Sequence, residues 1–426
     1  MCLPHRVEVG SRTLRWPTMA EVFGAETIEL TTDTLEASDT LALPETSETP
    51  ELPTTPAMPE TTVAAPAAVK AVAPEEPPTA KQEEQADSRT YLSSFYAALA
   101  QSGSRQVRVM HYGDSQIEED RMTSQIRQRL QERYGGSGVG LMPLAQTIPT
   151  YSVKQRLYMN GRWVTPQQGP RRYLVYGPRN MQRADGLYGP MGQVAIMADS
   201  LVKGSEDIHA AFTPIDKRPR YTQWRVVADT GVHYSFSGDT VLLTGKGAVY
   251  GLSQESAAGV IVDNIPMRGC LGLIFNKMSA PQLSRFYREA NVNLIILQFG
   301  GNAIPYNENP GTIAAIVKGL REQVQFVKHC APNASILFIG PSDMCTMVDG
   351  EVISYPLVGY MDRLLRKMAQ EEEIAYFSLY RWMGGSGSMA RWQEVGLATS
   401  DGVHFLRSGA RKAGNAVADW ILEGAN

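Results

Sequence analysis

Ser115 is the side chain in this sequence best placed to act as a nucleophile. It ends the segment 111–115 (HYGDS), which closes the apolar run 107–110 and precedes a helical pattern over 116–134. A serine on a tight turn between a strand and a helix exposes its hydroxyl and brings backbone N–H groups beside it. The pattern predicts acyl-transfer chemistry if other parts of the chain supply a base, an orienting acid and an oxyanion hole.

His404 is the histidine that we predict to activate Ser115. His111 lies on the strand before the turn glycine, so we expect it to point into the core or to brace the turn. The other four histidines lie near the N-terminus, in the region 143–256 or at a helix end: His5, His209, His233 and His329. His404 follows Asp401 by three positions in a loop before the last helical pattern, where the carboxylate can reach the imidazole Nδ1–H. The sequence therefore predicts a triad of Ser115, His404 and Asp401.

Two other predicted strands end in groups that could stabilise an oxyanion. The run 294–299 leads into Gly300-Gly301-Asn302, which would place the amide of Asn302 at the top of a sheet. The run 259–265 leads to Gly269, which offers an unhindered backbone N–H. Each segment alone is typical of an ordinary strand-to-helix turn. Together with the predicted triad they indicate donors for the charge that develops on a carbonyl oxygen.

Strand and helix patterns alternate through most of the chain. A short helix is predicted over 91–101, and the strand before Ser115 follows it. The later predicted strands are 259–265, 294–299, 335–339 and 374–379, and the later helices are 279–290, 311–329, 357–372 and 407–423. Alternation with helices of this length predicts βαβ crossovers and a parallel sheet covered on both faces. We therefore predict an α/β domain formed by 90–142 and 257–426.

The region 143–256 shows a different pattern. Short alternating runs at 223–227, 233–236 and 241–243 are separated by Gly, Asp, Asn and Pro residues, which predicts an inserted antiparallel β-sandwich. Some of its aromatic residues could stack on sugars, although the sandwich core is the more usual place for them. These are Tyr151, Trp163, Trp224 and Tyr234.

Residues 1–89 are predicted to form a disordered N-terminal segment. From position 25 onward this segment is rich in Thr, Pro, Glu and Ala and has no aromatic residue. Such a composition cannot bury enough apolar surface to offset the entropy of ordering. A long tether of this kind favours a periplasmic or cell-envelope enzyme held away from an anchor. The region 1–24 lacks the apolar core of a signal peptide, which favours a cytoplasmic alternative.

Composition argues against several other classes of function. The chain is 43% hydrophobic and 20% charged, with a net charge of −4, so it has no electrostatic footprint for nucleic acid. No run of 18 apolar residues is present to span a membrane. The four cysteines predict no disulfide framework, and Cys270 is expected to be a buried, inert thiol.

Cofactor chemistry is not indicated either. Glu118, Glu119 and Asp120 are consecutive, so they would face different sides of a helix, and we expect them to be solvated and to interact with the helix dipole. No Cys/His spacing fits a zinc site. We predict no metal and no organic cofactor.

Four ordered blocks resemble the signature of the SGNH (GDSL) hydrolase superfamily. They are Gly113-Asp114-Ser115, Gly269, Gly300-x-Asn302 and Asp401-x-x-His404, and the resemblance covers about 91–142 and 257–424. It implies a three-layer α/β/α, flavodoxin-like domain in which Ser115 is the nucleophile, His404 the general base and acid, and Asp401 its orienting residue. The Ser115 and Gly269 N–H groups and the Asn302 side chain would form the oxyanion hole. His111, Gly113 and Asp114 would support them.

A narrower likeness concerns bacterial cell-envelope esterases, including the peptidoglycan O-acetylesterase group. It rests on the phrases HYGDSQIEEDRMT, YGGSGVGLMP, VDNIPMRG, LIILQFGGN and IGPSDM, together with a sandwich placed after the first block. In those enzymes the insertion is a jelly roll like a carbohydrate-binding module, which implies an acylated, polymeric carbohydrate as partner. The leading hypothesis is a serine esterase that removes O-acetyl or other short acyl groups from an envelope glycan. An O-acetyltransferase and a non-catalytic glycan-binding protein remain as alternatives.

Overall fold

The structure is a computed structural model that describes residues 6–9, 12–15 and 87–425. Within the last range it leaves gaps at 145, 147, 160, 167–174, 177–192, 198–207, 216–220, 229–230, 246 and 306. The chain divides into two units, 1–83 and 84–426. In the first unit β1 (Arg6–Val9) and β2 (Arg12–Arg15) pair as an antiparallel hairpin. The hairpin lies within the segment 1–89, for which disorder was predicted, so that prediction does not hold for these paired strands; the rest of the segment up to position 86 lies outside the described residues.

Five parallel strands form the central sheet of the second unit. In spatial order they are β14 (Gly259–Pro266), β3 (Gln106–Gly113), β15 (Val292–Gln298), β16 (Ser335–Ile339) and β19 (Ala375–Phe377). All four pairings are parallel, as predicted. Numbered along the chain, the order is 2-1-3-4-5, the flavodoxin-like arrangement. Its switch point lies between β3 and β15, which is where open α/β sheets bind their ligands.

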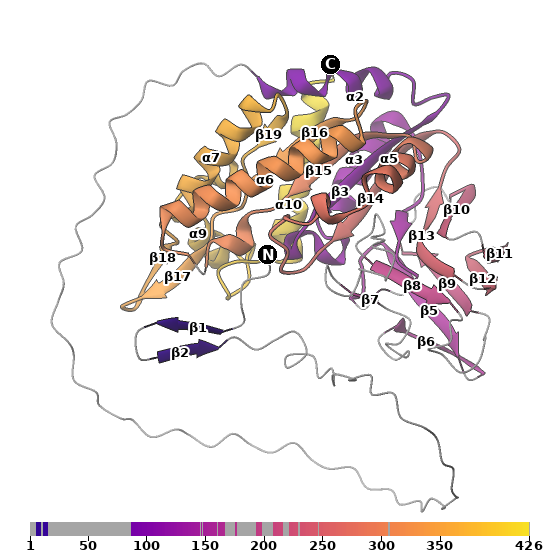
Figure 1. Cartoon of the computed structure of the whole chain (residues 1–426), viewed down its shortest axis with the longest axis horizontal. Helices are drawn as coiled ribbons and strands as arrows, with labels where there is room; N and C mark the ends of the chain where they lie inside the picture. Colours follow the sequence, from indigo (N-terminus) through magenta and orange to yellow (C-terminus); the bar gives the residue numbers. More distant parts are fainter. Residues whose placement is uncertain are drawn as a thin grey trace, which may run out of the picture. The chain divides into compact units, whose positions relative to one another are not determined.

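Helices cover both faces of this sheet (Figure 1). One side carries α5 (Ala280–Glu289), α6 (Pro310–Cys330) and α7 (Val358–Glu371), and on the other side α3 (Thr123–Tyr134) packs against α10 (Arg407–Glu423). The 3-10 helix η1 (Ser88–Leu92) and α2 (Ser93–Leu99) precede β3. The remaining elements of this domain are η2 (Ser115–Asp120), η5 (Phe275–Lys277), η6 (Gly301–Ala303), the hairpin of β17 (Cys345–Val348) and β18 (Glu351–Ser354), α8 (Leu379–Met383) and α9 (Ser388–Glu394).

Helix α6 shows how local sequence builds these layers. Asn309 caps it by accepting a hydrogen bond from Gly311 N at 2.8 Å, and Pro310 occupies the first turn, where its missing N–H costs nothing. Ile313, Leu320 and Val324 recur at helical spacing, and all are buried against the sheet. The predicted helix over 311–329 is therefore confirmed.

The continuous helix predicted over 116–134 is wrong. The chain instead forms η2, breaks, and restarts as α3, because Glu119 and Asp120 have φ of 60° and 61° in the left-handed region. The physical reason is that two of the acidic residues are buried rather than solvated. Glu118 pairs with Arg268, and Asp120 pairs with Arg127 and accepts a hydrogen bond from the Ser152 hydroxyl.

The described residues of the insertion form two antiparallel sheets, as the alternating runs predicted. One sheet contains β4 (Gly140–Met142), β7 (Val175–Tyr176), β8 (Gln193–Met197), β10 (Gln223–Ala228) and β13 (Gly247–Glu255). The other contains β5 (Val153–Met159), β6 (Arg162–Val164), β9 (Ile208–Pro214), β11 (Val232–Ser237) and β12 (Thr240–Gly245). Phe212, Leu243 and Leu252 lie in a hydrophobic core separate from that of the α/β domain. The jelly-roll topology stays a prediction.

Three of the four aromatic residues assigned to the sandwich core lie on its surface. Tyr151 is 36% exposed, Trp163 39% and Tyr234 54%, so the prediction is wrong for them. Trp224 is partly buried and stacks on Phe236, with ring centroids 5.0 Å apart. The buried core of the sandwich is formed mainly by aliphatic residues and Phe212, and the three exposed rings are not among its members.

A buried ion network joins the two domains. Arg108 of β3 contacts Asp263 of β14 and Glu255 of β13, both at 2.7 Å, and donates to the Ser253 hydroxyl at 3.0 Å. All three charged side chains are almost fully buried. Asp263 also accepts a hydrogen bond from Leu141 N at 2.7 Å, at the start of the insertion. Nothing in the sequence around Arg108 indicated these partners.

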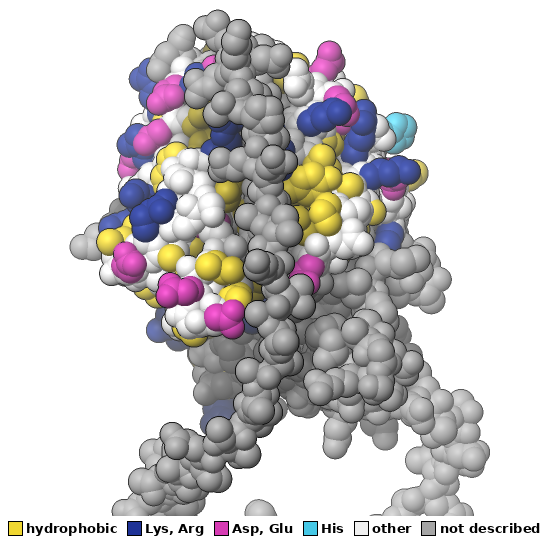
Figure 2. All heavy atoms as spheres, turned by 90° about the vertical axis from the view of Figure 1, so that its left-hand side faces the viewer, with side chains coloured by type: hydrophobic (Ala, Val, Ile, Leu, Met, Phe, Trp, Pro, Cys, Tyr) yellow, Lys and Arg dark blue, Asp and Glu magenta, His cyan; other side chains and the backbone are white. Residues whose placement is uncertain are grey.

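The outer surface of the α/β domain carries charges of both signs. Figure 2 shows basic and acidic side chains interspersed with apolar ones over the face that includes α7. Arg321 of α6 pairs there with Glu371 and Glu372. Among the helices that the structure describes, none is both long and apolar enough to cross a membrane.

Candidate active site

The sheet register brings three predicted site segments to one edge. Gly113 of β3 is paired with Pro266 of β14 on one side and with Gln298 of β15 on the other. Ser115, Gly269 and Asn302 follow these positions by two, three and four residues. Because parallel strands end at the same edge, the three side chains or backbone groups share the carboxyl end of the sheet at its switch point.

The turn that carries Ser115 is held by its neighbours. Asp114 caps η2 by accepting a hydrogen bond from Gln116 N at 2.9 Å. A Cβ at Gly113 would lie only 3.0 Å from Ile117 Cδ1, so the glycine permits the tight approach between strand and helix. Ser115 itself is partly exposed, which leaves its hydroxyl open to a substrate.

The predicted triad residues form a continuous hydrogen-bonded chain. Ser115 Oγ lies 2.8 Å from His404 Nε2, and His404 Nδ1 lies 2.7 Å from Asp401 Oδ2. A carboxylate can only accept, so the proton between the last pair belongs to Nδ1 and leaves Nε2 as an acceptor. The Ser115 hydroxyl therefore donates to Nε2, as a serine does before its proton is abstracted.

Asp401 is held in its ionised form. Partial burial alone would raise the pKa of its carboxyl, but hydrogen bonds from Thr399, His404 and backbone N–H groups hold that pKa well below its usual range. Val403 N and His404 N each donate to Oδ1 at 2.9 Å, and Thr399 Oγ1 donates to the same oxygen at 2.5 Å. The loop thus presents a fixed negative charge to the imidazole.

Gly269 adopts a conformation that suits glycine. Its φ is 67°, in the left-handed region, and no atom would obstruct a Cβ, so backbone conformation rather than space selects the residue. Its loop is tied to the serine turn, because Met267 N donates to the Gly113 carbonyl at 2.7 Å. The N–H of Gly269 remains a predicted oxyanion donor.

Asn302 links all three loops. Its Nδ2 donates to Asp114 Oδ2 at 3.0 Å and to the Cys270 carbonyl at 3.2 Å. Both amide hydrogens therefore face protein acceptors, and the oxyanion role of Asn302 stays a prediction. Burial raises the pKa of Asp114 to about 6, although the Gln116 N–H, the electrostatic interaction with the His404 imidazole and the Asn302 amide act in the opposite direction.

An ion pair beside the site was not predicted from the sequence. Arg268 Nε lies 2.7 Å from Glu118 Oε1, and its Nη2 lies 2.5 Å from Oε2, so the pair is bidentate. The Glu118 side chain is 4% exposed and that of Arg268 is 48% exposed. This pair connects η2, which begins at Ser115, to the loop of Gly269. Arg268 directly precedes Gly269 and Glu118 follows Ser115 by three residues, but no local pattern in the sequence pairs the two side chains.

His111 has the internal position that was expected. It is fully buried, with Nε2 at 3.0 Å from Gln298 Oε1 and Nδ1 at 2.9 Å from Thr123 Oγ1. Burial lowers the pKa of its imidazole to about 3, so the ring is neutral and braces β3 against β15 and α3. It makes no contact with Ser115.

Cys270 differs from its prediction, because it is partly exposed rather than buried. Cys330 and Cys345 are buried free thiols. Within the described residues, no three His, Cys, Asp or Glu side chains converge as ligands for a metal ion.

Comparison with known proteins identifies the fold. No family profile and no curated protein sequence matches the chain. A solved structure of a peptidoglycan O-acetylesterase is similar to it with a TM-score of 0.61 and 21% identity, over 80% of this chain and 96% of that chain. The chain therefore has an SGNH hydrolase-like fold. The match extends over most of both chains, and an identity of 21% shows the fold alone.

Smaller esterases match a shorter part of the chain. An acetyl xylan esterase is similar with a TM-score of 0.29 and 16% identity, over 38% of this chain and 79% of that chain. A catalytic mutant of an acetylxylan esterase from Geobacillus stearothermophilus has a TM-score of 0.25 and 14% identity, over 39% and 73% of the two chains.

Proposed function

We propose that this chain is a serine esterase that removes O-acetyl or other short acyl groups from a cell-envelope glycan. The observation that carries the proposal is the relay from Ser115 through His404 to Asp401, with contacts of 2.8 and 2.7 Å, at the carboxyl end of the sheet. The fold is shared with a peptidoglycan O-acetylesterase structure, which supports an acylated carbohydrate as substrate. An envelope location is part of this proposal.

Acylation begins with attack of Ser115 Oγ on the ester carbonyl carbon. The serine proton moves to His404 Nε2, and Asp401 stabilises the imidazolium that forms. The carbonyl oxygen becomes an oxyanion near the Ser115 and Gly269 N–H groups. It can also compete for an Asn302 hydrogen with the Cys270 carbonyl, because a charged acceptor forms the stronger bond. The intermediate then expels the sugar oxygen, which takes the proton from Nε2.

Deacylation repeats these steps with water. His404 Nε2 removes a proton from a water molecule, whose oxygen attacks the acyl-serine carbonyl. The second tetrahedral intermediate releases the carboxylic acid and returns the proton to Ser115 Oγ. Every proton is transferred at a nitrogen that already lies within hydrogen-bonding distance of the serine. Both steps use only the triad residues, the proposed oxyanion donors and water.

The insertion offers a surface suited to a glycan. Tyr158 and Trp163 are 42% and 39% exposed and contact each other edge to face, with ring centroids 5.4 Å apart. The Arg156 guanidinium lies 5.4 Å from the Trp163 ring centre. Exposed aromatic faces beside a hydrogen-bond donor are able to stack on sugar rings. This observation also favours the second candidate, a non-catalytic glycan-binding protein, which would use the same rings without the triad.

The first experiment measures acetate release from an aryl acetate and from an O-acetylated glycan polymer. We expect Ser115→Ala to lower kcat about 10⁴-fold on both, because the nucleophile is lost. Ser104→Ala, an exposed serine that bonds only to the Gln101 carbonyl, is the matched control. Wild-type turnover by Ser115→Ala would refute the triad. Binding of the polymer by the wild-type protein without acetate release would favour the glycan-binding candidate.

An O-acetyltransferase would use the same relay with a sugar hydroxyl in place of water. Incubation of the wild-type enzyme with a labelled acetyl donor and a glycan acceptor separates the two reactions. Label recovered as free acetate supports the esterase, and label on the glycan supports the transferase.

A further inference from the structure

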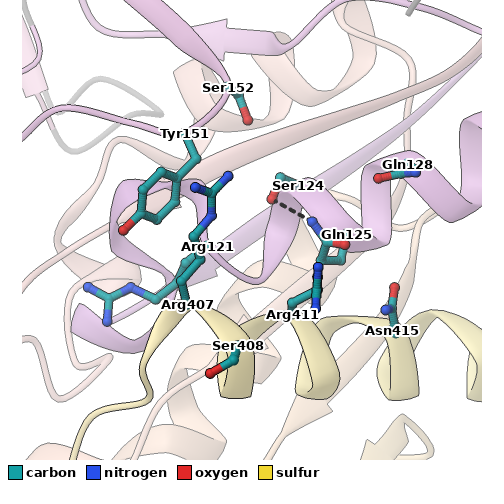
Figure 3. Close-up of a pocket in the computed structure, with 10 residues that line it drawn as sticks. All are labelled: Arg121, Ser124, Gln125, Gln128, Tyr151, Ser152, Arg407, Ser408, Arg411 and Asn415. Atoms are coloured by element: carbon teal, nitrogen blue, oxygen red, sulfur yellow. Dashed lines mark hydrogen bonds between the residues drawn. The ribbon is translucent and has the colours of Figure 1, made fainter. Parts of the chain in front are cut away.

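A groove lies beside the triad, between α3 and α10. Its volume is about 870 Å³, and all its lining side chains are polar, cationic or phenolic (Figure 3). Arg121, Ser124, Gln125, Gln128, Tyr151, Ser152, Arg407, Ser408, Arg411 and Asn415 form its walls. The lining contains three arginines and no carboxylate. Its chemistry therefore differs from that of the mixed surface over α7.

The arginines are only partly neutralised by the protein. Arg121 donates to the Glu118 and Phe405 carbonyls, and the nearest carboxylate to its guanidinium is that of Glu119, at 3.6 Å. Arg407 lies over the Tyr151 ring, 4.1 Å from its centre, which orients the guanidinium without neutralising it. Arg411 forms no ion pair with any described residue, and Figure 3 shows it pointing from α10 toward Gln125.

The placement of Arg407 and Arg411 works against helix stability. They occupy positions i and i+4 of α10, where like charges repel each other. They also lie near the start of that helix, whose dipole disfavours cations there, and its first turn has no acidic residue. A bound anion would remove both penalties. The geometry therefore points to a ligand that carries negative charge.

The groove is close enough to the triad to hold the same substrate. Arg407 follows His404 by three residues, so their Cα atoms are at most about 11 Å apart. Arg121 contacts the carbonyl of Phe405, the residue next to His404, at 3.1 Å. A glycan whose ester lies at Ser115 could therefore extend its neighbouring sugars into the groove.

From these contacts we propose that the groove binds the carboxylates of an acidic glycan and selects acylated acidic sugars as substrates. Arginine pairs with carboxylate through two parallel hydrogen bonds, and three arginines line the groove. The amides of Gln125, Gln128 and Asn415 add donors and acceptors that match sugar hydroxyls. This inference rests on the proposed esterase function and adds the charge class of its substrate.

The test compares two acetylated oligosaccharides of equal length, an oligogalacturonide and a neutral xylo-oligosaccharide. The readout is the ratio of kcat/KM for the acidic to the neutral substrate, which cancels any general loss of active enzyme. We expect Arg411→Gln to lower this ratio 5- to 20-fold at low salt, because it removes a charged donor. The drop should shrink at 1 M salt, where charges are screened. An unchanged ratio would overturn the proposal.

The matched control is Lys412→Gln, which removes one positive charge from the next position of α10. Lys412 lies over the Trp392 ring and does not line the groove, so the ratio should stay within twofold of wild type. An equal drop in both variants would mean that net charge rather than the groove selects the substrate. Thermal unfolding gives a second readout. Arg411→Gln should have a melting temperature equal to or above that of the wild type, because the repulsion between Arg407 and Arg411 is relieved.

Direct binding separates this proposal from the esterase function. Calorimetry with oligogalacturonide that carries no acetyl group needs no turnover. Binding by the wild-type protein that weakens at least 5-fold in Arg411→Gln would support the groove even if neither acetylated substrate were hydrolysed. No binding by the wild-type protein would overturn it even if the esterase assay succeeded.

Discussion

Polar side chains are buried at the carboxyl edge of the parallel sheet, whereas in the inserted sandwich they lie on the surface. At the sheet edge, Asp114 and Glu118 are buried and bonded to fixed partners. In the sandwich, polar and aromatic side chains such as Tyr158 and Tyr234 lie on the surface, around a small apolar core. The first arrangement fixes the geometry of a few atoms, and the second leaves a broad surface free to contact a polymer. The sheet edge is therefore suited to the proposed chemistry, and the sandwich surface could add polymer contacts to those of the groove between α3 and α10.

The largest expected effect concerns Arg108, which joins the two regions. Arg108→Met should lower the free energy of unfolding by about 3–5 kcal/mol, because Asp263 and Glu255 would remain buried without their shared partner. Urea unfolding followed by both tryptophan fluorescence and circular dichroism measures it. Arg225→Met, which removes the more exposed partner of Glu255, should cost about 1 kcal/mol or less. Equal losses in the two variants would contradict the role of burial.

The variant Asp114→Asn tests whether burial of the Asp114 carboxyl, which holds the serine turn in place, lowers the free energy of unfolding. Its folded pKa of about 6 lies above the ordinary value of 3.8, so its contribution to stability is full below pH 3.8 and is lost as pH rises through 6. Asp114→Asn should therefore gain stability relative to wild type by roughly 2–3 kcal/mol between pH 4 and pH 8. Unfolding free energies of both proteins across that range provide the measurement. A constant difference would show that Asp114 titrates normally.

The pair of Glu118 and Arg268 tests whether this contact positions the loop that carries Gly269, the predicted oxyanion donor. We expect Arg268→Gln to lower kcat about 10-fold with little change in KM, because the loop of Gly269 would lose its bidentate link to η2. Aryl acetate kinetics measure this split. Arg285→Gln removes an exposed pair with Glu289 and should behave as wild type. A rise in KM alone would instead make Arg268 a substrate-binding residue.

The smallest effect is expected in the sandwich. Trp163→Ala should weaken activity on a glycan polymer about threefold while unfolding stays within about 0.5 kcal/mol of wild type, because the ring is exposed. The ratio of polymer to aryl acetate turnover measures it. Tyr234→Ala removes an exposed ring that lies on a different strand, β11, and serves as the comparison. Equal losses in both variants would show that no particular aromatic patch meets the glycan.

The sequence predicted the elements of the sheet more fully than the contacts of the site. The runs 107–110 and 294–299 and the turn after each one were enough to place Ser115 and Asn302 at one edge, because parallel strands share their direction. The bidentate pair of Glu118 and Arg268 depends on which loops meet in space, and local patterns carry no such information. The alternation in the sandwich likewise predicted strands without showing which face of each would be covered.

The histidines show the same division within the site. His404 could be selected because it follows Asp401 at a spacing that a loop can close, and the two side chains are within hydrogen-bonding distance. For His111, position on a strand predicted an internal place but not its partners. Gln298 and Thr123 contact it from β15 and α3, and only the assembled layers bring those elements together.

The pairing of β4 with β13 has a consequence for how the chain reaches this structure. These strands begin and end the insertion, with Met142 opposite Leu252 and Gly140 opposite Gln254. Neighbouring strands β3 and β14 must meet across the whole of 114–258, and closing so long a loop as free chain costs about 4 kcal/mol in entropy. A sandwich that has already formed brings the two ends together and removes most of that cost. The insertion would then act as a folding template, and slow-folding variants of the sandwich should delay the appearance of the proposed esterase activity during refolding.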